Sequence, residues 1–202
     1  MGKAYTEEEK IEIKKRIWEA AIELFHSSDA KKLNLRTLTS MAGISLGSFY
    51  NFYPDKESLM ADIIKYRVKQ KLDVMRLDFP ASKKDPQKFL IKVVHSNFVS
   101  MDDKISNQDI YKEAYSILST DINRTRALIM NEYLLYLKDL NAYWKKNGIA
   151  AKVDEKGILN LIKGLIAYSE TKEEMDRKYY DDLLKSFIET AVHKYLKKRE
   201  NK

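Results

Sequence analysis

Small polar residues and aromatic residues are interleaved in the stretch ISLGSFYNFYPDKESL, residues 44–59. The side chains of Ser45, Ser48 and Asn51 can donate or accept hydrogen bonds, and Asn51 follows Ser48 by about one helical turn. Gly47 lies among them and allows a close approach of the backbone. A short helix with such a face suits the base edges of a DNA major groove, which is about 12 Å wide. The stretch therefore predicts a recognition helix.

Aromatic residues on the other side of this stretch are predicted to attach it to its domain. A helix of about two turns is marginal in water by itself, so it needs tertiary anchoring. We expect Phe49, Phe52 and Tyr53 to pack inward, while the Tyr50 hydroxyl reaches a DNA phosphate. Pro54 is predicted to end the helix, because the residue before a proline is disfavoured in helical geometry.

The flanking elements complete a helix-turn-helix pattern. A first helix is predicted from a capping box at residues 6–9 to about residue 28, with apolar residues at helical spacing. A short second helix follows an Asn34 cap and ends at Gly43, before a third helix capped by Ser45. Two short helices joined by a tight turn that contains glycine are the signature of this motif.

The remaining sequence also favours helices. A long helix is predicted over 55–77 after an Asp55 cap, and residues 79–86, with two prolines, form the clearest linker. Further helices are expected near 86–101, 107–119, 122–146, 154–170 and 176–198, with a break at residues 102–103. We therefore predict an all-α protein with a three-helix DNA-binding domain (1–54), a linking helix (55–78) and a ligand-binding and dimerisation domain of five to six helices (79–202).

Composition and charge exclude several kinds of site and partner. The chain has 202 residues, a net charge of +7 and no cysteine, which excludes disulfides and thiolate metal sites. No apolar run reaches the roughly 18 to 20 residues of a membrane span, so we expect no membrane partner. Residues 1–60 contain 9 Lys or Arg and 9 Asp or Glu, so only local basic residues can attract a polyanion there.

An enzyme is the second hypothesis, and the sequence disfavours it. The chain lacks a phosphate loop, a dinucleotide fingerprint, an H-E-x-x-H motif and a G-x-S-x-G elbow. Its three histidines, His26, His95 and His193, are far apart in sequence, so we expect no catalytic centre, no metal site and no cofactor. The third hypothesis is a protein whose C-terminal half binds another protein.

Residues 10–60 resemble the TetR family of bacterial transcriptional regulators. The resemblance rests on the run NLRTLTSMAGISLGSFYNFYPDKESL, whose glycine, serine, aromatic and lysine spacing is highly specific to that family. Residues 80–202 match the family only in length and helical character. The resemblance implies a cytoplasmic homodimer that binds a palindromic operator and is usually released by a small-molecule inducer. We expect a repressor; the alternatives are an activator or regulation by a protein partner.

The same resemblance implies functional residues. Leu46 departs from it, since many relatives have a basic or polar residue there, and an apolar contact to a thymine methyl is then expected. Two further departures are Thr39 in place of alanine and Asn34 in place of threonine. The predicted DNA-binding residues are Arg36, Thr37, Ser45, Leu46, Gly47, Ser48, Tyr50, Asn51 and Lys56.

Two sets of residues are predicted in the C-terminal half. Aromatic and polarisable side chains between the middle helices suit an apolar or aromatic effector, although such residues are more often core. The predicted ligand-binding residues are His95, Phe98, Met101, Tyr115, Tyr133, Trp144 and Tyr168. Broad apolar faces on the last two helices suit a four-helix bundle between two subunits. The predicted dimer interface is Ile158, Leu161, Ile162, Leu165, Leu184, Phe187, Ile188 and Tyr195.

Overall fold

The computed structural model describes residues 5–26, 33–107, 109, 111–112, 116 and 122–198, without the side chains of 101–102, 104–106, 122–126 and 128. The chain forms two compact units. Unit 1 comprises residues 1–67 and 104–128, and unit 2 comprises residues 68–103 and 129–202. Both are built almost entirely from helices, which confirms the predicted all-α class.

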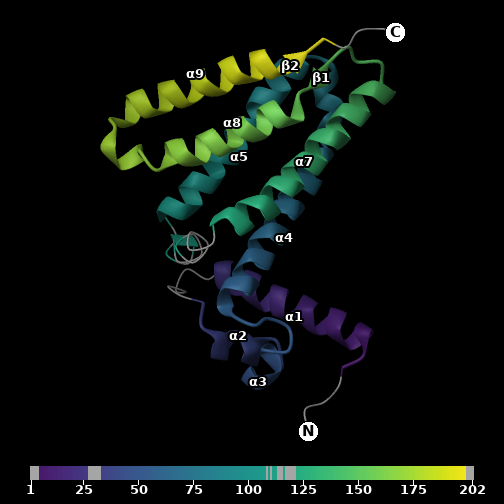
Figure 1. Ribbon diagram of the computed structural model, residues 1–202, viewed down its shortest axis with the longest axis vertical. Helices are drawn as coiled ribbons and strands as arrows, with labels where there is room; N and C mark the ends of the chain where they lie inside the picture. The colour runs from purple at the N-terminus through teal and green to yellow at the C-terminus, as the bar shows by residue number, and fades with distance from the viewer. Residues whose placement is uncertain are drawn as a thin grey trace. The chain divides into compact units, whose positions relative to one another are not determined.

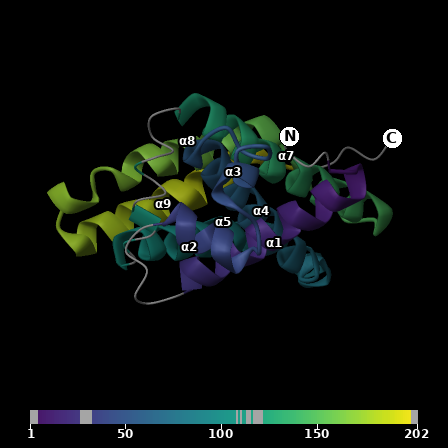
Figure 2. The same cartoon turned by 90° about the horizontal axis from the view of Figure 1, so that it is seen from below.

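Unit 1 contains α1 (Glu7–His26), α2 (Leu35–Met41), α3 (Leu46–Phe49) and the first part of α4 (Lys56–Arg76). Figures 1 and 2 show α2 beside α1 and α3 beside α2. The predicted capping box is present, because Thr6 and Glu9 exchange side chain to backbone hydrogen bonds of 2.9 and 3.1 Å. Apolar side chains of all four helices form one buried cluster, made of Ile13, Ile17, Ala20, Ala21, Phe25, Leu33, Leu38, Ala42, Phe49, Tyr53, Leu59, Met60 and Ile63.

The third helix is shorter than predicted. Regular helix spans only Leu46–Phe49, and residues 50–52 form turns. The Phe52 N–H donates to the Phe49 carbonyl at 2.9 Å and the Tyr53 N–H donates to the same carbonyl at 3.1 Å. Phe49 is fully buried and Tyr53 is 4% exposed, so the predicted inward anchoring is confirmed. Tertiary burial, and not helix length, therefore holds this segment.

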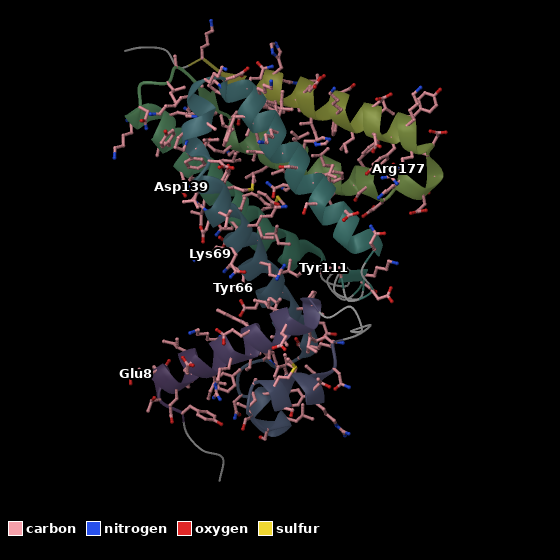
Figure 3. The ribbon with its side chains drawn as sticks, turned by 180° about the vertical axis from the view of Figure 1, so that it is seen from behind. Glu8, Tyr66, Lys69, Tyr111, Asp139 and Arg177 are labelled. Atoms are coloured by element: carbon pink, nitrogen blue, oxygen red, sulfur yellow. The ribbon has the colours of Figure 1, made fainter. Side chains whose placement is uncertain are left out.

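Unit 2 is a larger group of helices with one small strand pair. It contains the rest of α4, η1 (Phe79–Lys83), α5 (Pro86–Asn107), α7 (Ile122–Lys146), β1 (Lys152–Val153), α8 (Glu155–Ser169), η2 (Lys172–Glu174), α9 (Arg177–Tyr195) and β2 (Leu196–Lys197), although α5 and α7 each extend into unit 1. Arg76 on α4 forms an ion pair with Asp139 on α7, which is labelled in Figure 3: Nε and Nη2 of the guanidinium each lie 2.8 Å from Oδ2 of the carboxylate. α8 and α9 lie side by side (Figure 1).

Three predictions about this half differ from the structure, and a fourth, the helix near 107–119, is largely untested. The predicted break at residues 102–103 is wrong, because α5 continues to Asn107. The predicted linker at 79–86 is a packed 3-10 turn in which Phe79 and Ser82 are buried. The predicted helix near 107–119 lies mostly outside the described residues. The helix predicted to reach residue 198 ends at Tyr195, where β2 begins.

Two buried hydrogen-bond groups hold the connections of unit 2. Asn141 donates to the Val153 carbonyl at 3.0 Å and accepts from the Val153 N–H at 2.8 Å, which holds the end of β1 against α7. β1 and β2 pair antiparallel, Lys152 opposite Lys197. Trp144, fully buried, donates to the Ser82 hydroxyl at 2.7 Å, and that hydroxyl donates to the Phe79 carbonyl at 2.6 Å. Asn141 is thus paired with backbone groups 12 residues away, and Trp144 with a hydroxyl 62 residues away.

None of the helices in the described part of the chain is long and apolar enough to cross a membrane.

Candidate nucleic-acid interface

The N-terminal end of α2 presents two of the predicted DNA-binding residues. The Asn34 side chain accepts from the backbone N–H groups of Arg36 (2.9 Å) and Thr37 (3.3 Å), so the expected cap is present. The side chains of Arg36 and Thr37 are exposed. Thr39 is 3% exposed, and its hydroxyl donates to the Arg36 carbonyl at 3.1 Å. The extra hydroxyl at Thr39 is therefore satisfied within its own helix.

The turn between α2 and α3 depends on a glycine. Gly43 has φ of +66°, a conformation in which other residues are strained. Its N–H donates to the Ser40 carbonyl at 3.1 Å, and the Ile44 N–H donates to the Thr39 carbonyl at 3.0 Å. These bonds reverse the chain at the end of α2 and bring α3 against it, as the helix-turn-helix prediction requires.

The predicted base-reading residues lie on the surface of α3 and the turn after it. Ser45, Gly47 and Asn51 are exposed, and Ser48 is half-buried. Leu46 is also half-buried, so its apolar side chain is only partly open to a ligand such as a thymine methyl. The small polar residues thus remain at least partly accessible, while Phe49 and Tyr53 are buried and Phe52 is half-buried.

Tyr50 is the most exposed aromatic side chain of this segment. It is 52% exposed, and its ring packs edge-on against Phe49 with the centroids 5.4 Å apart. The ring is therefore held by the core while much of the residue faces solvent. Lys56, at the start of α4, is half-buried. The expected Asp55 cap is present, since its carboxylate accepts the Ser58 N–H at 2.7 Å.

A hydrogen-bond relay that sequence analysis missed fixes the end of the recognition segment. The Trp18 indole N–H donates to the Tyr53 hydroxyl at 2.7 Å, and that hydroxyl donates to the Asp62 carboxylate at 2.8 Å. Burial, followed by the nearby Asp62 charge, raises the pKa of Tyr53 well above its usual range. Tyr66, labelled in Figure 3, stacks on Trp18 with ring centroids 5.0 Å apart. The relay ties α1, the segment after α3 and α4 together.

Tyr5 is a second residue that sequence analysis missed. Its hydroxyl donates to the Ser48 hydroxyl at 3.2 Å, and its ring lies 5.6 Å from the Phe52 ring. The local sequence does not predict this contact, because 43 residues separate Tyr5 from Ser48.

The predicted ligand-binding residues belong mainly to the core of unit 2. Phe98 is 6% exposed and Trp144 is fully buried, where Ser82 holds its indole. Tyr133 and Tyr168 are half-buried against the same core, and the Tyr168 hydroxyl donates to a backbone carbonyl at 3.1 Å. The Tyr115 position and the Met101 side chain lie outside the described residues. These four described aromatic residues therefore have structural contacts of their own.

His95, the remaining candidate, lines an open depression of about 780 Å³ between α5 and α9. The other lining residues are mostly charged or polar: Asp85, Gln87, Lys88, Ile91, Lys92, Ser96, Lys185 and Glu189. None of the other predicted ligand-binding residues lines it. This depression differs from the apolar site that the sequence predicted.

The predicted interface residues divide between the interior and the surface of unit 2. Five of them are buried in the core of their own chain: Ile158, Leu161, Leu165, Leu184 and Ile188. Ile162 and Tyr195 are half-buried, and Phe187 is 47% exposed. Only the latter three retain surface for a partner. Leu183, one turn before Phe187, is 51% exposed, and Tyr179, two turns before it, is 63% exposed, so both extend its face along α9.

Solved structures resemble this chain along most of its length. RolR in complex with the ligand resorcinol matches with a TM-score of 0.66 and 14% identity over 94% of this chain and 90% of RolR. The transcriptional regulator FadR from Bacillus subtilis, in complex with stearoyl-CoA, matches with a TM-score of 0.50 and 18% identity over 88% of this chain and 97% of FadR. The multidrug binding protein EbrR, complexed with imidazole, has a TM-score of 0.47 at 14% identity, over 86% of this chain and 93% of EbrR.

The chain has a TetR-like fold. The resemblance of residues 10–60 to that family thus predicted the fold correctly, including the helical C-terminal half in which the sequence match is weak. No protein-family model and no curated protein matches the sequence significantly. At 14–18% identity, the TetR-like fold is what these structures share with the chain.

Proposed function

We propose that this protein is a sequence-specific DNA-binding transcription regulator that binds a palindromic operator as a homodimer and is released from it by a small-molecule effector. In this proposal it acts as a repressor, residues 1–54 read DNA, residues 55–78 form the linking helix, and residues 79–202 bind the effector and dimerise. It has no catalytic activity.

The observation that carries the proposal is the division of the α3 segment into two faces. Ser45, Gly47 and Asn51 are exposed, whereas Phe49 and Tyr53 are almost completely buried. Small polar side chains on an anchored helix N-terminus can approach base edges, while exposed groups such as Arg36 and Tyr50 are suited to the phosphate backbone. A segment built only for stability would have no need to keep its outer face small and polar.

The fold supports the effector part of the proposal. The TetR-like structures of RolR and FadR contain resorcinol and stearoyl-CoA, so this architecture accommodates small molecules of different sizes. An effector releases DNA only if it binds one conformation of the protein more tightly than the other. The half-buried Tyr133 and Tyr168, packed on the unit 2 core, remain our candidate contacts for an apolar or aromatic effector.

The exposed face of α9 supports dimerisation. Tyr179, Leu183 and Phe187 follow one another at four-residue intervals and all remain exposed in the single chain. Large apolar side chains aligned on one helix face are typical of a subunit interface. We propose that this face, with Ile162 and Tyr195, packs against its symmetry mate, while the five buried candidates support it from inside.

Selection of bound duplexes from a random DNA pool tests the central claim. The wild-type protein should enrich a palindromic site whose half-sites are about one helical turn apart, ~34 Å. Tyr50→Ala should weaken binding to all sequences, because a backbone contact carries no sequence information, and should leave the protein folded, as judged by far-UV circular dichroism. Binding that is only nonspecific and salt-sensitive would overturn the proposal.

Two further measurements test the other parts. Phe187→Glu should shift the sedimentation coefficient from dimer to monomer and leave the far-UV circular dichroism unchanged. A thermal-shift screen of aromatic and apolar compounds should find a ligand that raises the melting temperature and lowers operator affinity. A ligand that raises operator affinity would instead support an activator or corepressor-type response.

A further inference from the structure

Three hydroxyl groups form a continuous chain at the candidate base-reading surface. The Tyr5 hydroxyl donates to Ser48 Oγ at 3.2 Å, and Ser48 Oγ lies 2.9 Å from Ser45 Oγ. Ser45 Oγ also accepts the Ser48 backbone N–H at 3.0 Å, as the cap of α3. The Tyr5 ring is supported by Phe52, with ring centroids 5.6 Å apart. A residue outside the helix-turn-helix therefore contacts a residue that is predicted to read DNA.

The donor at one end of this chain orients the rest of it. A hydroxyl has one proton to donate and two lone pairs to accept with. Either serine can donate across the 2.9 Å contact; because Tyr5 donates into Ser48, cooperativity favours the head-to-tail arrangement in which Ser48 donates in turn to Ser45. Ser45 Oγ then accepts two hydrogen bonds, one from the Ser48 hydroxyl and one from the Ser48 N–H, and both of its lone pairs are used. The one group that Ser45 can still offer to a ligand is its O–H proton.

We infer that Tyr5 is a specificity-determining residue: it makes the exposed Ser45 hydroxyl a hydrogen-bond donor only, so that Ser45 selects an acceptor on a base edge. Guanine N7 and O6, adenine N7 and thymine O4 are such acceptors in the major groove, whereas cytosine presents only its amino donor there. Ser45 should therefore discriminate against cytosine at the position it reads. This inference rests on the proposed DNA-binding function.

Removal of the Tyr5 hydroxyl should relax this discrimination. In Tyr5→Phe the ring that packs on Phe52 is kept, but nothing donates to Ser48 from that side. The Ser45–Ser48 pair can then reverse, with Ser45 donating to Ser48 and keeping one lone pair free. Ser45 can then accept from a cytosine amino group. Tyr5 thus acts through Ser48 and Ser45 and need not touch DNA.

The test compares base preferences. Random-pool selection with the wild-type protein defines the site, and Ser45→Ala identifies the base pair that Ser45 reads by loss of preference there. Dissociation constants for the four possible base pairs at that position are then measured for the wild type, for Tyr5→Phe and for Tyr143→Phe. The Tyr143 substitution is the matched control, because it removes a tyrosine hydroxyl from a half-buried ring in unit 2.

We expect Tyr5→Phe to reduce the penalty for cytosine by about 3- to 10-fold, the range of one hydrogen bond, and to change affinity for the preferred site by less than about 2-fold. Tyr143→Phe should keep the wild-type preferences. In a Ser48→Ala background, Tyr5→Phe should no longer change the base preference, because the chain of hydroxyl groups is already interrupted at Ser48.

Two results would overturn the inference. One is that Tyr5→Phe leaves the ranking of the four dissociation constants, and the ratios between them, as they are in the wild type. The other is an equal loss of affinity for all four base pairs together with a lower melting temperature, which would mean that Tyr5 only stabilises the fold. Both outcomes leave the proposed function intact if the wild type binds a specific site. A wild type without sequence preference would instead remove the proposed function, and the inference with it.

Discussion

Two glycines in the same helix should respond to the same substitution in opposite directions. Gly157 and Gly164 both lie in α8. A methyl group added at Gly164 would meet the Phe187 ring at 3.4–3.5 Å, an ordinary van der Waals contact. A methyl group added at Gly157 would overlap the Tyr195 ring, whose Cε1 would be 2.8 Å away and whose Cδ1 and Cγ would be closer still. We predict that Gly164→Ala stabilises unit 2 and that Gly157→Ala destabilises it.

The magnitudes follow from helix propensity and packing. Alanine is better than glycine inside a helix by about 1 kcal/mol, so Gly164→Ala should raise the free energy of unfolding by up to about that amount. Overpacking costs about 1–3 kcal/mol, and Gly157→Ala adds it against the same propensity gain. The Tyr195 backbone has little freedom to move, because its carbonyl accepts the Asp154 N–H at 2.8 Å beside the β1–β2 pair. The ring can therefore avoid the added methyl group only by leaving its present rotamer. The net loss should be up to about 2 kcal/mol.

Urea unfolding, with hydrogen exchange measured separately on peptides from each unit, is the appropriate assay. The two variants should differ by about 1–3 kcal/mol, or roughly 2–12 °C in melting temperature for a chain of this size. Peptides from α8 and α9 should show the change, while peptides from α1 and α2 serve as the internal control. Equal effects of the two substitutions, or a stabilising Gly157→Ala, would refute the packing argument. Sedimentation of Gly164→Ala should be run in parallel, since Phe187 belongs to the proposed dimer face.

Three further outcomes are expected. Tyr53→Phe should lower the free energy of unfolding of unit 1 by about 1–3 kcal/mol in a urea titration, because Trp18 and Asp62 both lose the hydroxyl that lies between them. Asp62→Asn in the Tyr53→Phe background should recover part of the lost stability. Ser82→Ala should cost about 1–3 kcal/mol, because the Trp144 indole N–H is left buried without an acceptor; an unchanged urea midpoint contradicts this. Burial raises the pKa of Tyr136, an effect that the nearby Arg76 partly opposes, so the native state holds this proton more tightly than the unfolded state does. The stabilisation is therefore complete below the usual tyrosine pKa of about 10 and is lost as pH rises beyond it. Tyr136→Phe should reduce this loss in an alkaline unfolding series followed by tyrosinate absorbance, and Tyr53, whose pKa is also raised, should contribute to what remains.

Sequence patterns predicted most helix positions because the signals that start and stop helices are local. The Asn34, Asp55 and Asp154 side chains cap helices through backbone groups two or three residues away. Such contacts can be inferred from the order of residues alone. The same reasoning failed at residues 102–103, where two aspartates suggested a break and α5 continues. Aspartate is a weak helix former, and propensity yields readily to tertiary context.

Periodicity alone did not separate the inside of α9 from its outside. Apolar residues cover more than one face of this helix, so a sequence pattern marks them all as candidates. In the structure Leu184 and Ile188 are buried, while Leu183 and Phe187 remain about half exposed. The position of α8 against α9 decides which face is covered, and that position results from packing of the whole unit.

The sequence by itself determined the helical class, the helix-turn-helix and the small polar surface of the recognition segment, because these depend on composition and on contacts within a few residues. Only the tertiary structure decided what holds that segment. Tyr5 reaches Ser48 across 43 residues, and Trp18 reaches Tyr53 across 35. Hydrogen bonds between such distant residues form only after the helices have packed, because burial of the apolar faces brings the two ends of the domain together. For this reason the residues that contact the proposed base-reading segment from a distance cannot be predicted from the order of the residues.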